Sequence, residues 1–212
     1  MQPLHELILL LVVLTDLWIL GTSRLSSMIR AAATQGALLA VLPVVLFPHT
    51  SVHVLGLAVG TFAVKAVILP YFLTRAIREA AVRREIEPLI GFTASLMLGA
   101  AAIALAFTIA PRLALPNLPS SMLVPVALST VIIGLIILTT RNKALTQVIG
   151  YLVLENGIYA FGLSQAERVP FLVDVGVLLD VFAGVFIMGI VVFQINREFD
   201  SLSSARLSEL KD

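Results

Sequence analysis

The chain has 212 residues, of which 59% are hydrophobic and only 13% are charged. A soluble domain is about 25% charged, so this composition excludes an ordinary soluble protein and predicts an integral membrane protein. The net charge of +1 provides no basic surface for nucleic acid. The absence of cysteine excludes disulfides and Cys-ligated zinc or iron–sulfur centres in this chain.

Seven segments are long and apolar enough to cross a bilayer, which takes about 20 residues each. We therefore predict an all-α, polytopic membrane helix bundle that forms a single transmembrane domain. Residues 1–87 hold spans one to three with a helical extension over Thr74–Glu87, residues 88–118 hold span four and a loop, and residues 119–212 hold the last three spans and a tail. The predicted spans are Leu4–Leu20, Ser27–Phe47, Ser51–Leu73, Pro88–Ala110, Ser120–Thr140, Thr146–Leu163 and Pro170–Asn196.

The first segment is interpreted as a retained span rather than a signal peptide, because it has no basic n-region and Asp16 interrupts it. Basic residues are distributed unevenly between the two sides of the predicted bundle. Only Arg112 and Arg168 lie on one side and Lys65 lies inside a span. Because cytoplasmic loops are rich in Lys and Arg, the N-terminus is expected outside and the C-terminus in the cytoplasm. The cytoplasmic basic residues would be Arg24, Arg30, Arg75, Arg78, Arg83, Arg84, Arg141, Lys143, Arg197, Arg206 and Lys211.

Two carboxylates lie in the middle of apolar runs, Glu155 within Gln147–Leu163 and Asp180 within Phe171–Phe193. An acid at the centre of a bilayer costs roughly 3 kcal/mol on insertion scales, and such residues usually mark an ion or proton path. The alternative is a structural role, since buried polar side chains also hold membrane helices together. We predict that Glu155 and Asp180 belong to a proton path.

Lys65 lies near the middle of the third span, too deep to extend its amine easily to the interface. We expect Lys65 to pair with Glu155, Asp180 or Asp16. The pair would belong to a proton path or would be a purely structural ion pair. Asp16 has Lys65 or an arginine of another subunit as candidate partners and is also predicted to belong to the proton path. Asp174 lies nearer the outside and is expected to be an interfacial acid, with proton exit as the second interpretation.

Spans one to three and five to seven have similar sequences, which suggests a parallel internal repeat of the kind found in some transporters. An offset of 120 residues places Gln35 opposite Glu155 and Gly60 opposite Asp180. Membrane helices share composition, so chance similarity is the competing explanation.

The last three spans contain a specific pattern of residues. Arg141-Asn142 precedes a helix with Gly150 and Asn156, the following helix has Asp180 and Gly184, and the tail runs from Asp200-Ser201-Leu202-Ser203 to Ser208-Glu209-Leu210. This region resembles the small three-helix membrane subunit K of respiratory complex I and its small relative in multisubunit sodium/proton antiporters. The family's first glutamate would fall at Leu152, whereas this chain has Glu155, three residues further along and on about the same helical face.

A chain of this length with this ending resembles the hydrogenase-4 component E family, the membrane subunits of formate hydrogenlyase-type [NiFe]-hydrogenases. The resemblance implies a bacterial or archaeal inner-membrane subunit that contacts antiporter-like subunits and the membrane anchor subunit. The nickel–iron and iron–sulfur centres would lie on those partner assemblies, with no cofactor, metal or catalytic centre in this chain. The alternatives are a non-conducting scaffold of such a complex and a component of a cation/proton antiporter.

Overall fold

A computed structural model describes residues 2–47, 52–79, 88–115 and 118–166, together with positions 179, 182, 184–187 and 189. Helices account for most of these residues, and no strand occurs among them. The helices are α1 (Gln2–Gly21), α2 (Leu25–Leu46), α3 (Val52–Thr61), α4 (Leu69–Glu79), α5 (Phe92–Ile109), α6 (Leu123–Thr140) and α7 (Ala144–Ser164). A π-helix, η1 (Phe62–Ile68), joins α3 directly to α4, and a 3₁₀ turn, η2 (Ala110–Leu113), follows α5.

Five helical segments are long and apolar enough to cross a membrane, which confirms the prediction of an α-helical membrane protein. They coincide with the first five predicted spans and are Leu4–Gly21, Leu25–Leu46, Leu55–Arg78, Phe92–Leu113 and Leu123–Thr140. Helix α7 has the length of a span, but Gln147, Glu155 and Asn156 lower its hydropathy. Helix α4 continues to Glu79, within the predicted extension. Most of the seventh predicted span, including Asp174 and Asp180, lies outside the described residues.

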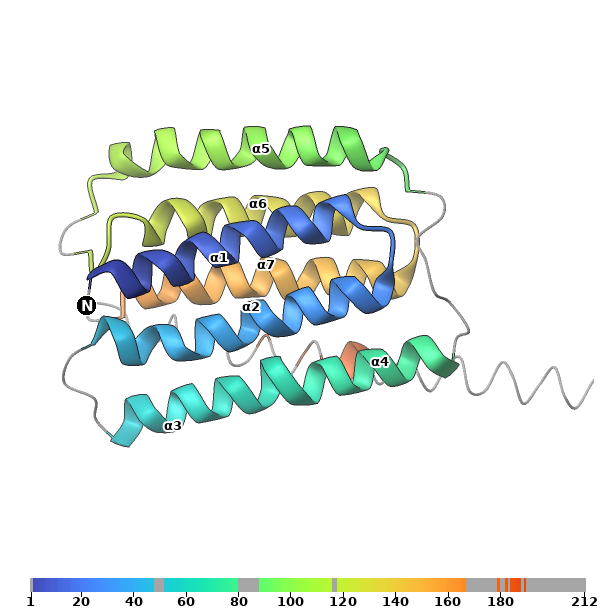
Figure 1. Ribbon diagram of the computed structural model, residues 1–212, viewed down its shortest axis with the longest axis horizontal. Helices are drawn as coiled ribbons and strands as arrows, with labels where there is room; N and C mark the ends of the chain where they lie inside the picture. The colour runs from blue at the N-terminus through green and yellow to red at the C-terminus, as the bar shows by residue number, and fades with distance from the viewer. Residues whose placement is uncertain are drawn as a thin grey trace, which may run out of the picture.

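The helices lie roughly side by side and form a layered bundle (Figure 1). Helix α5 lies along one edge against α1 and α6, and the continuous α3–η1–α4 helix lies along the opposite edge against α2. Between these edges α1 packs on α2 and α6, while α7 packs on α6 and α2. Helix α7 is therefore enclosed by other helices over most of its length, which explains how it accommodates polar residues that a lipid-facing helix would not.

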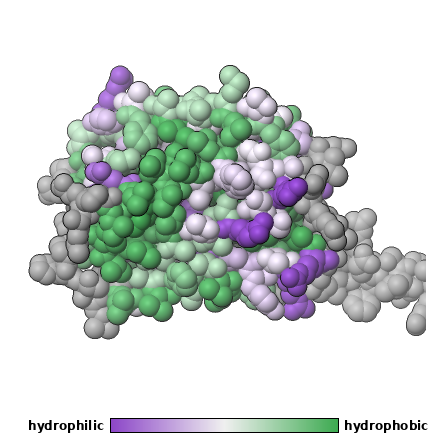
Figure 2. All heavy atoms as spheres, in the orientation of Figure 1, coloured by the Kyte–Doolittle hydropathy of each residue, from purple (hydrophilic) through white to green (hydrophobic). Residues whose placement is uncertain are grey.

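One end of the bundle, here called the arginine-rich end, carries Arg24, Arg30, Arg75, Arg78 and Arg141. The helix order places these residues together because α1 and α6 end there while α2 and α7 begin there. Figure 2 shows apolar side chains over much of the visible surface, with hydrophilic residues concentrated toward this end. This apolar surface fits a bundle embedded in lipid. The opposite end of the bundle, where α1 and α6 begin, is called the far end.

Arg141 is not a solvated loop residue, because only 1% of it is exposed. Its Nη2 donates a hydrogen bond to the carbonyl oxygen of Leu20 at 3.0 Å, and its Nη1 donates to that of Ile90 at 3.2 Å. The guanidinium also lies 4.8 Å from the ring centroid of Phe92. Carbonyl groups at a helix C-terminus lack helical partners and carry partial negative charge. Arg141 therefore fastens the end of α1 and the start of α5 to the α6–α7 join.

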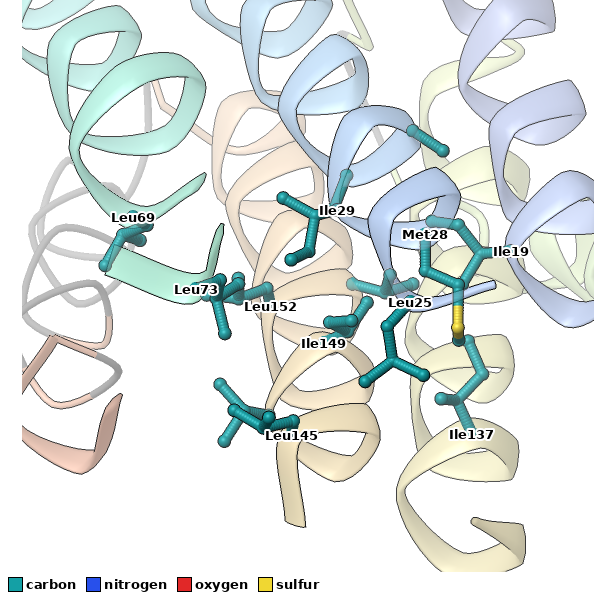
Figure 3. Close-up of a cluster of buried hydrophobic side chains, with 14 of the residues drawn as sticks. Ile19, Leu25, Met28, Ile29, Leu69, Leu73, Ile137, Leu145, Ile149 and Leu152 are labelled. Carbon is teal, nitrogen blue, oxygen red and sulfur yellow. The ribbon is translucent and has the colours of Figure 1, made fainter. Parts of the chain in front are cut away.

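Two apolar clusters fill the interior of the bundle. The arginine-side cluster includes residues of α1, α2, α4, α6 and α7, and Figure 3 shows Ile19, Met28, Leu73, Ile137 and Leu152 among its members. The far-side cluster includes Ile8, Leu9, Val12, Leu39, Leu42, Leu123, Val126, Ala127, Tyr159, Ala160 and Leu163. On each helix that contributes to both clusters, a gap of a few residues separates the two sets. Buried polar side chains occupy that gap.

Helices α6 and α7 form the tightest pair because glycines remove side chains between them. A methyl group at Gly157 would lie 2.6 Å from the backbone nitrogen of Val131, and one at Gly150 would lie 2.8 Å from that of Leu138. Small residues let membrane helices approach closely, which maximises van der Waals contact where lipid offers no hydrophobic driving force. This contact sets the position of the polar residues on α7.

Candidate functional site

Six of the buried polar residues form one layer about halfway along the bundle. Gln35 and Thr130 each lie ten residues from the arginine-rich end of their helices, at Leu25 and Thr140, and Glu155 lies eleven residues from Ala144. At 1.5 Å per residue these positions are about 15 Å from that end. The polar layer consists of Asp16, Gln35, Lys65, Thr130, Glu155 and Asn156, all of them buried.

One half of the layer is a chain of hydrogen bonds that begins at Asp16. The Thr130 hydroxyl donates to Asp16 Oδ2 at 2.7 Å, and Gln35 Nε2 donates to Asp16 Oδ1 at 2.7 Å. Asn156 Nδ2 donates to Gln35 Oε1 at 2.9 Å. The four residues come from α1, α2, α6 and α7. Each amide therefore has a fixed orientation, and the chain links four helices at one level.

The other half of the layer is an ion pair between Lys65 of η1 and Glu155 of α7. Lys65 Nζ also lies 5.6 Å from the ring centroid of Tyr159, within the range of a cation–π interaction. Glu155 is fully buried, and 5% of Lys65 is exposed. Glu155 and Asn156 are neighbours in sequence, so α7 brings the ion pair next to the end of the hydrogen-bond chain.

The π-helix keeps Lys65 facing the bundle. Four of the buried residues along this edge are spaced four apart, namely Thr61, Lys65, Leu69 and Leu73. In an ideal α-helix three such steps rotate a side chain by about 120°, since each turn takes 3.6 residues. The wider turn of η1 reduces this rotation and holds all four residues on one face. Single π-helical turns inside α-helices occur frequently at functional sites.

Gly36 gives Lys65 room to approach α2. A methyl group on Gly36 would lie 2.6 Å from Lys65 Cβ, closer than real side chains come. Two pairs of small residues four apart in the sequence, Ala32 with Gly36 and Gly56 with Gly60, are of the kind that permits close helix contact. The contact occurs at Gly36, whereas no heavy atom of the described residues lies within 4 Å of a methyl group built on Gly56 or Gly60.

A small cavity borders both halves of the layer. Lys65, Glu155 and Asn156 form its polar wall, and its apolar wall includes Ile29 and Leu73 of the arginine-side cluster. Its volume is about 10 Å³, the lower limit for one water molecule. The cavity lies on the side of the ion pair that faces the arginine-rich end. A single water there would contact the ion pair and the amide of Asn156.

Comparison with known proteins finds relatives of the chain in bacteria. It is 34% identical over 203 residues to the uncharacterized protein Rv0085 of Mycobacterium tuberculosis, and the match covers 94% of this chain and 92% of the relative. The chain belongs to the same family as Rv0085. It is also 26% identical over 153 residues to Hydrogenase-4 component E of Escherichia coli and of Shigella flexneri, a match that covers 72% of this chain and 71% of each relative.

No family model matches the chain, and no solved structure matches it. The similarity to Hydrogenase-4 component E agrees in part with the resemblance that the sequence showed. The expected likeness of the last three spans to subunit K, and the internal repeat, have no solved structure to support them.

The structure brings together three of the five predicted site residues. Lys65 pairs with Glu155, one of the three partners that the sequence left open. Asp16 contacts Gln35 and Thr130 rather than Lys65. Asp174 and Asp180 lie outside the described residues.

Sequence reasoning did not identify Gln35, Thr130 and Asn156 as members of the site. Polar residues without charge are common in membrane helices, so none of the three stands out alone. A signal was available in Gln35, because an amide side chain in the middle of an apolar span needs partners for both its oxygen and its nitrogen. Asn156 also follows an intramembrane glutamate directly, which places two polar groups at the same depth.

Proposed function

We propose that this chain is a membrane subunit of a complex-I-like, membrane-bound hydrogenase and carries part of its proton path. The observation that supports this most is the Lys65–Glu155 ion pair, buried at mid-depth beside a cavity of water size. Intramembrane ionisable residues that pair with each other commonly belong to proton relays. The similarity to Hydrogenase-4 component E supports the proposal that the parent complex is a hydrogenase.

The ion pair provides two groups whose charge states depend on each other. A proton that binds the Glu155 carboxylate neutralises the counter-ion of Lys65. A buried ammonium group that loses its counter-ion is energetically costly, so release of a proton from Lys65 to water follows. Glu155 then returns its proton to Lys65, which restores the ion pair. Each cycle moves one proton across the layer without a net change in the protein.

The parent complex would supply the energy for this cycle. Catalysis and electron transfer would occur on cytoplasmic partners that hold the nickel–iron and iron–sulfur centres. This chain would lie between an antiporter-like subunit and the membrane anchor subunit, with its arginine-rich end toward the cytoplasm. Asp180 and Asp174 would continue the path in the last span, and the subunit K-like arrangement and the parallel repeat form part of this proposal. Charge changes in neighbouring subunits would favour one state of the Lys65–Glu155 pair over the other.

The test replaces Glu155 with glutamine in the intact complex. Glu155→Gln keeps the size of the side chain but cannot bind a proton, so proton translocation per electron pair should fall to background in inverted membrane vesicles. Hydrogenase activity measured with a soluble electron acceptor should persist, and the complex should copurify with all its subunits. Asp180→Asn should behave in the same way. Glu6→Gln, near the start of α1 and outside the polar layer, is the matched control and should leave translocation unchanged.

A non-conducting scaffold is the second candidate, favoured by the hydrogen bonds that Asp16 accepts from two neutral side chains. In that case the ion pair is permanent and serves assembly alone. Glu155→Gln would then reduce the amount of assembled complex, while the complex that remains would translocate protons at the normal ratio. This result would overturn the relay. Copurification of the chain with antiporter-like and hydrogenase subunits tests the assignment to the complex under either candidate.

A further inference from the structure

Thr61 differs from the other threonines of the bundle in its hydrogen bonding. It is 4% exposed, and its hydroxyl has no hydrogen-bond partner among the described residues. Six other threonine hydroxyls donate to a carbonyl oxygen three or four residues back in their own helix, and Thr130 donates to Asp16. The helix-bonded threonines are Thr15, Thr34, Thr74, Thr108, Thr139 and Thr140. The chain thus contains a buried hydroxyl that can both donate and accept.

Thr61 lies next to the ion pair on its far side. It precedes η1 directly and occupies the same buried face as Lys65, one helical turn toward the far end. The small cavity lies on the other side of Lys65, where Ile29, Leu69 and Leu73 line it. Lys65 is therefore placed between the cavity and the Thr61 hydroxyl.

Tyr159 occupies the corresponding position on α7. It is one turn beyond Glu155, fully buried, and its ring faces Lys65 Nζ. Between the ion pair and the far end, the far-side cluster is otherwise apolar and includes Leu39 and Leu42 of α2. A proton that leaves Lys65 toward the far end thus has Thr61 as the nearest hydroxyl on its own helix.

We infer that Thr61 binds a water molecule that connects Lys65 to the far end of the bundle. This inference rests on the proposed function and extends its path. The water accepts a proton from the Lys65 ammonium group and passes one of its own protons onward, so its composition does not change. Thr61 is a positioning residue, since its hydroxyl holds the water and does not itself change charge. Buried waters typically make about three hydrogen bonds, of which Thr61 and Lys65 would supply two.

The experiment compares Thr61→Val with Thr61→Ser in the intact complex. Valine has nearly the same shape but no hydroxyl, whereas serine keeps the hydroxyl. Ser95→Ala is the control, because Ser95 is also buried and its hydroxyl has no partner among the described residues, yet it lies on α5 outside the polar layer. Proton translocation per electron pair is measured in inverted vesicles, and a cryo-EM map of the complex is inspected for ordered water at Thr61 Oγ1.

Thr61→Val should slow proton translocation about tenfold, the factor in rate for a barrier change of about 1.4 kcal/mol, and so lower the translocation ratio. Thr61→Ser and Ser95→Ala should keep the normal ratio, and the map should show water at Thr61. A normal ratio in Thr61→Val, while Glu155→Gln abolishes translocation, would overturn this inference and leave the proposed function intact. A map with the Thr61 hydroxyl bonded to the Leu57 carbonyl and no water would also overturn it. A normal ratio in Glu155→Gln would instead overturn the proposed function.

Discussion

The two halves of the polar layer satisfy buried carboxylates in opposite ways. Asp16 accepts hydrogen bonds from the neutral groups of Thr130 and Gln35, at one level of four packed helices. Glu155 is paired with the charged Lys65, on a π-helix and beside a cavity. Neutral donors hold an acid in place whatever the rest of the protein does. A charged partner makes the state of each group depend on the other, so the second half is the one suited to respond to neighbouring subunits.

The largest effect should follow from removing the lysine of the ion pair. Lys65→Met leaves Glu155 without its cationic partner and should lower the free energy of unfolding by about 3–5 kcal/mol. The midpoint of an SDS titration of the purified chain measures this change. The double variant Lys65→Met with Glu155→Gln should regain much of the lost stability but not proton translocation. An unchanged midpoint in Lys65→Met would show that the pair contributes nothing to the fold.

Filling the space at Gly36 should also displace Lys65, the lysine of the charged half. Gly36→Val forces η1 away from α2, because a methyl group there would already lie 2.6 Å from Lys65 Cβ. Overpacking of this kind typically costs about 1–3 kcal/mol. The same SDS titration measures it, and Gly60→Val is the matched control, with open space at that position in the described part of the chain. Equal losses for both variants would contradict the close approach at Gly36.

Gln35 tests the neutral half directly. Gln35→Leu has a similar size but removes one hydrogen-bond donor from Asp16 and the acceptor of Asn156. Hydrogen bonds between membrane helices contribute about 0.6 kcal/mol on average and up to about 1.7 kcal/mol, so the loss should lie between about 1 and 2 kcal/mol. Thermal unfolding of the detergent-solubilised chain detects this difference. Gln35→Glu would add a second acid beside Asp16 and should destabilise the chain more than Gln35→Leu does.

The smallest effect should follow from neutralising Asp16. In Asp16→Asn the side-chain oxygen still accepts from Gln35, and the Thr130 hydroxyl can rotate to accept from the new amide. The expected loss is below about 1 kcal/mol, within the range of a single membrane hydrogen bond. Proton translocation in the intact complex gives the decisive measurement. A normal ratio would assign Asp16 to packing, whereas loss of translocation in a stable variant would place it in the proton path, as the sequence predicted.

Within the described residues, the sequence alone located the helices but did not determine which face of each helix turns inward. Hydropathy located both ends of each of the first five spans to within five residues. The reason is that about 20 apolar residues in succession have few alternatives to a membrane helix. The same reasoning identified Glu155, Lys65 and Asp16 as costly residues. It left three partners open for Lys65 and did not include Gln35, Thr130 or Asn156. Pairing depends on which face of each helix turns inward, and composition does not encode that.

By itself, the sequence determined that this is an α-helical membrane protein with charged groups held at mid-depth, because the cost of moving charge and polar backbone into lipid is a property of the residues themselves. The tertiary structure alone decided that Lys65 meets Glu155 and that Asp16 is bound by neutral side chains. It also revealed that Arg141 fastens helix ends instead of facing solvent. The Lys65–Glu155 pairing depends on a π-helical turn and on glycines that permit close approach, and both act through distances between helices far apart in the chain.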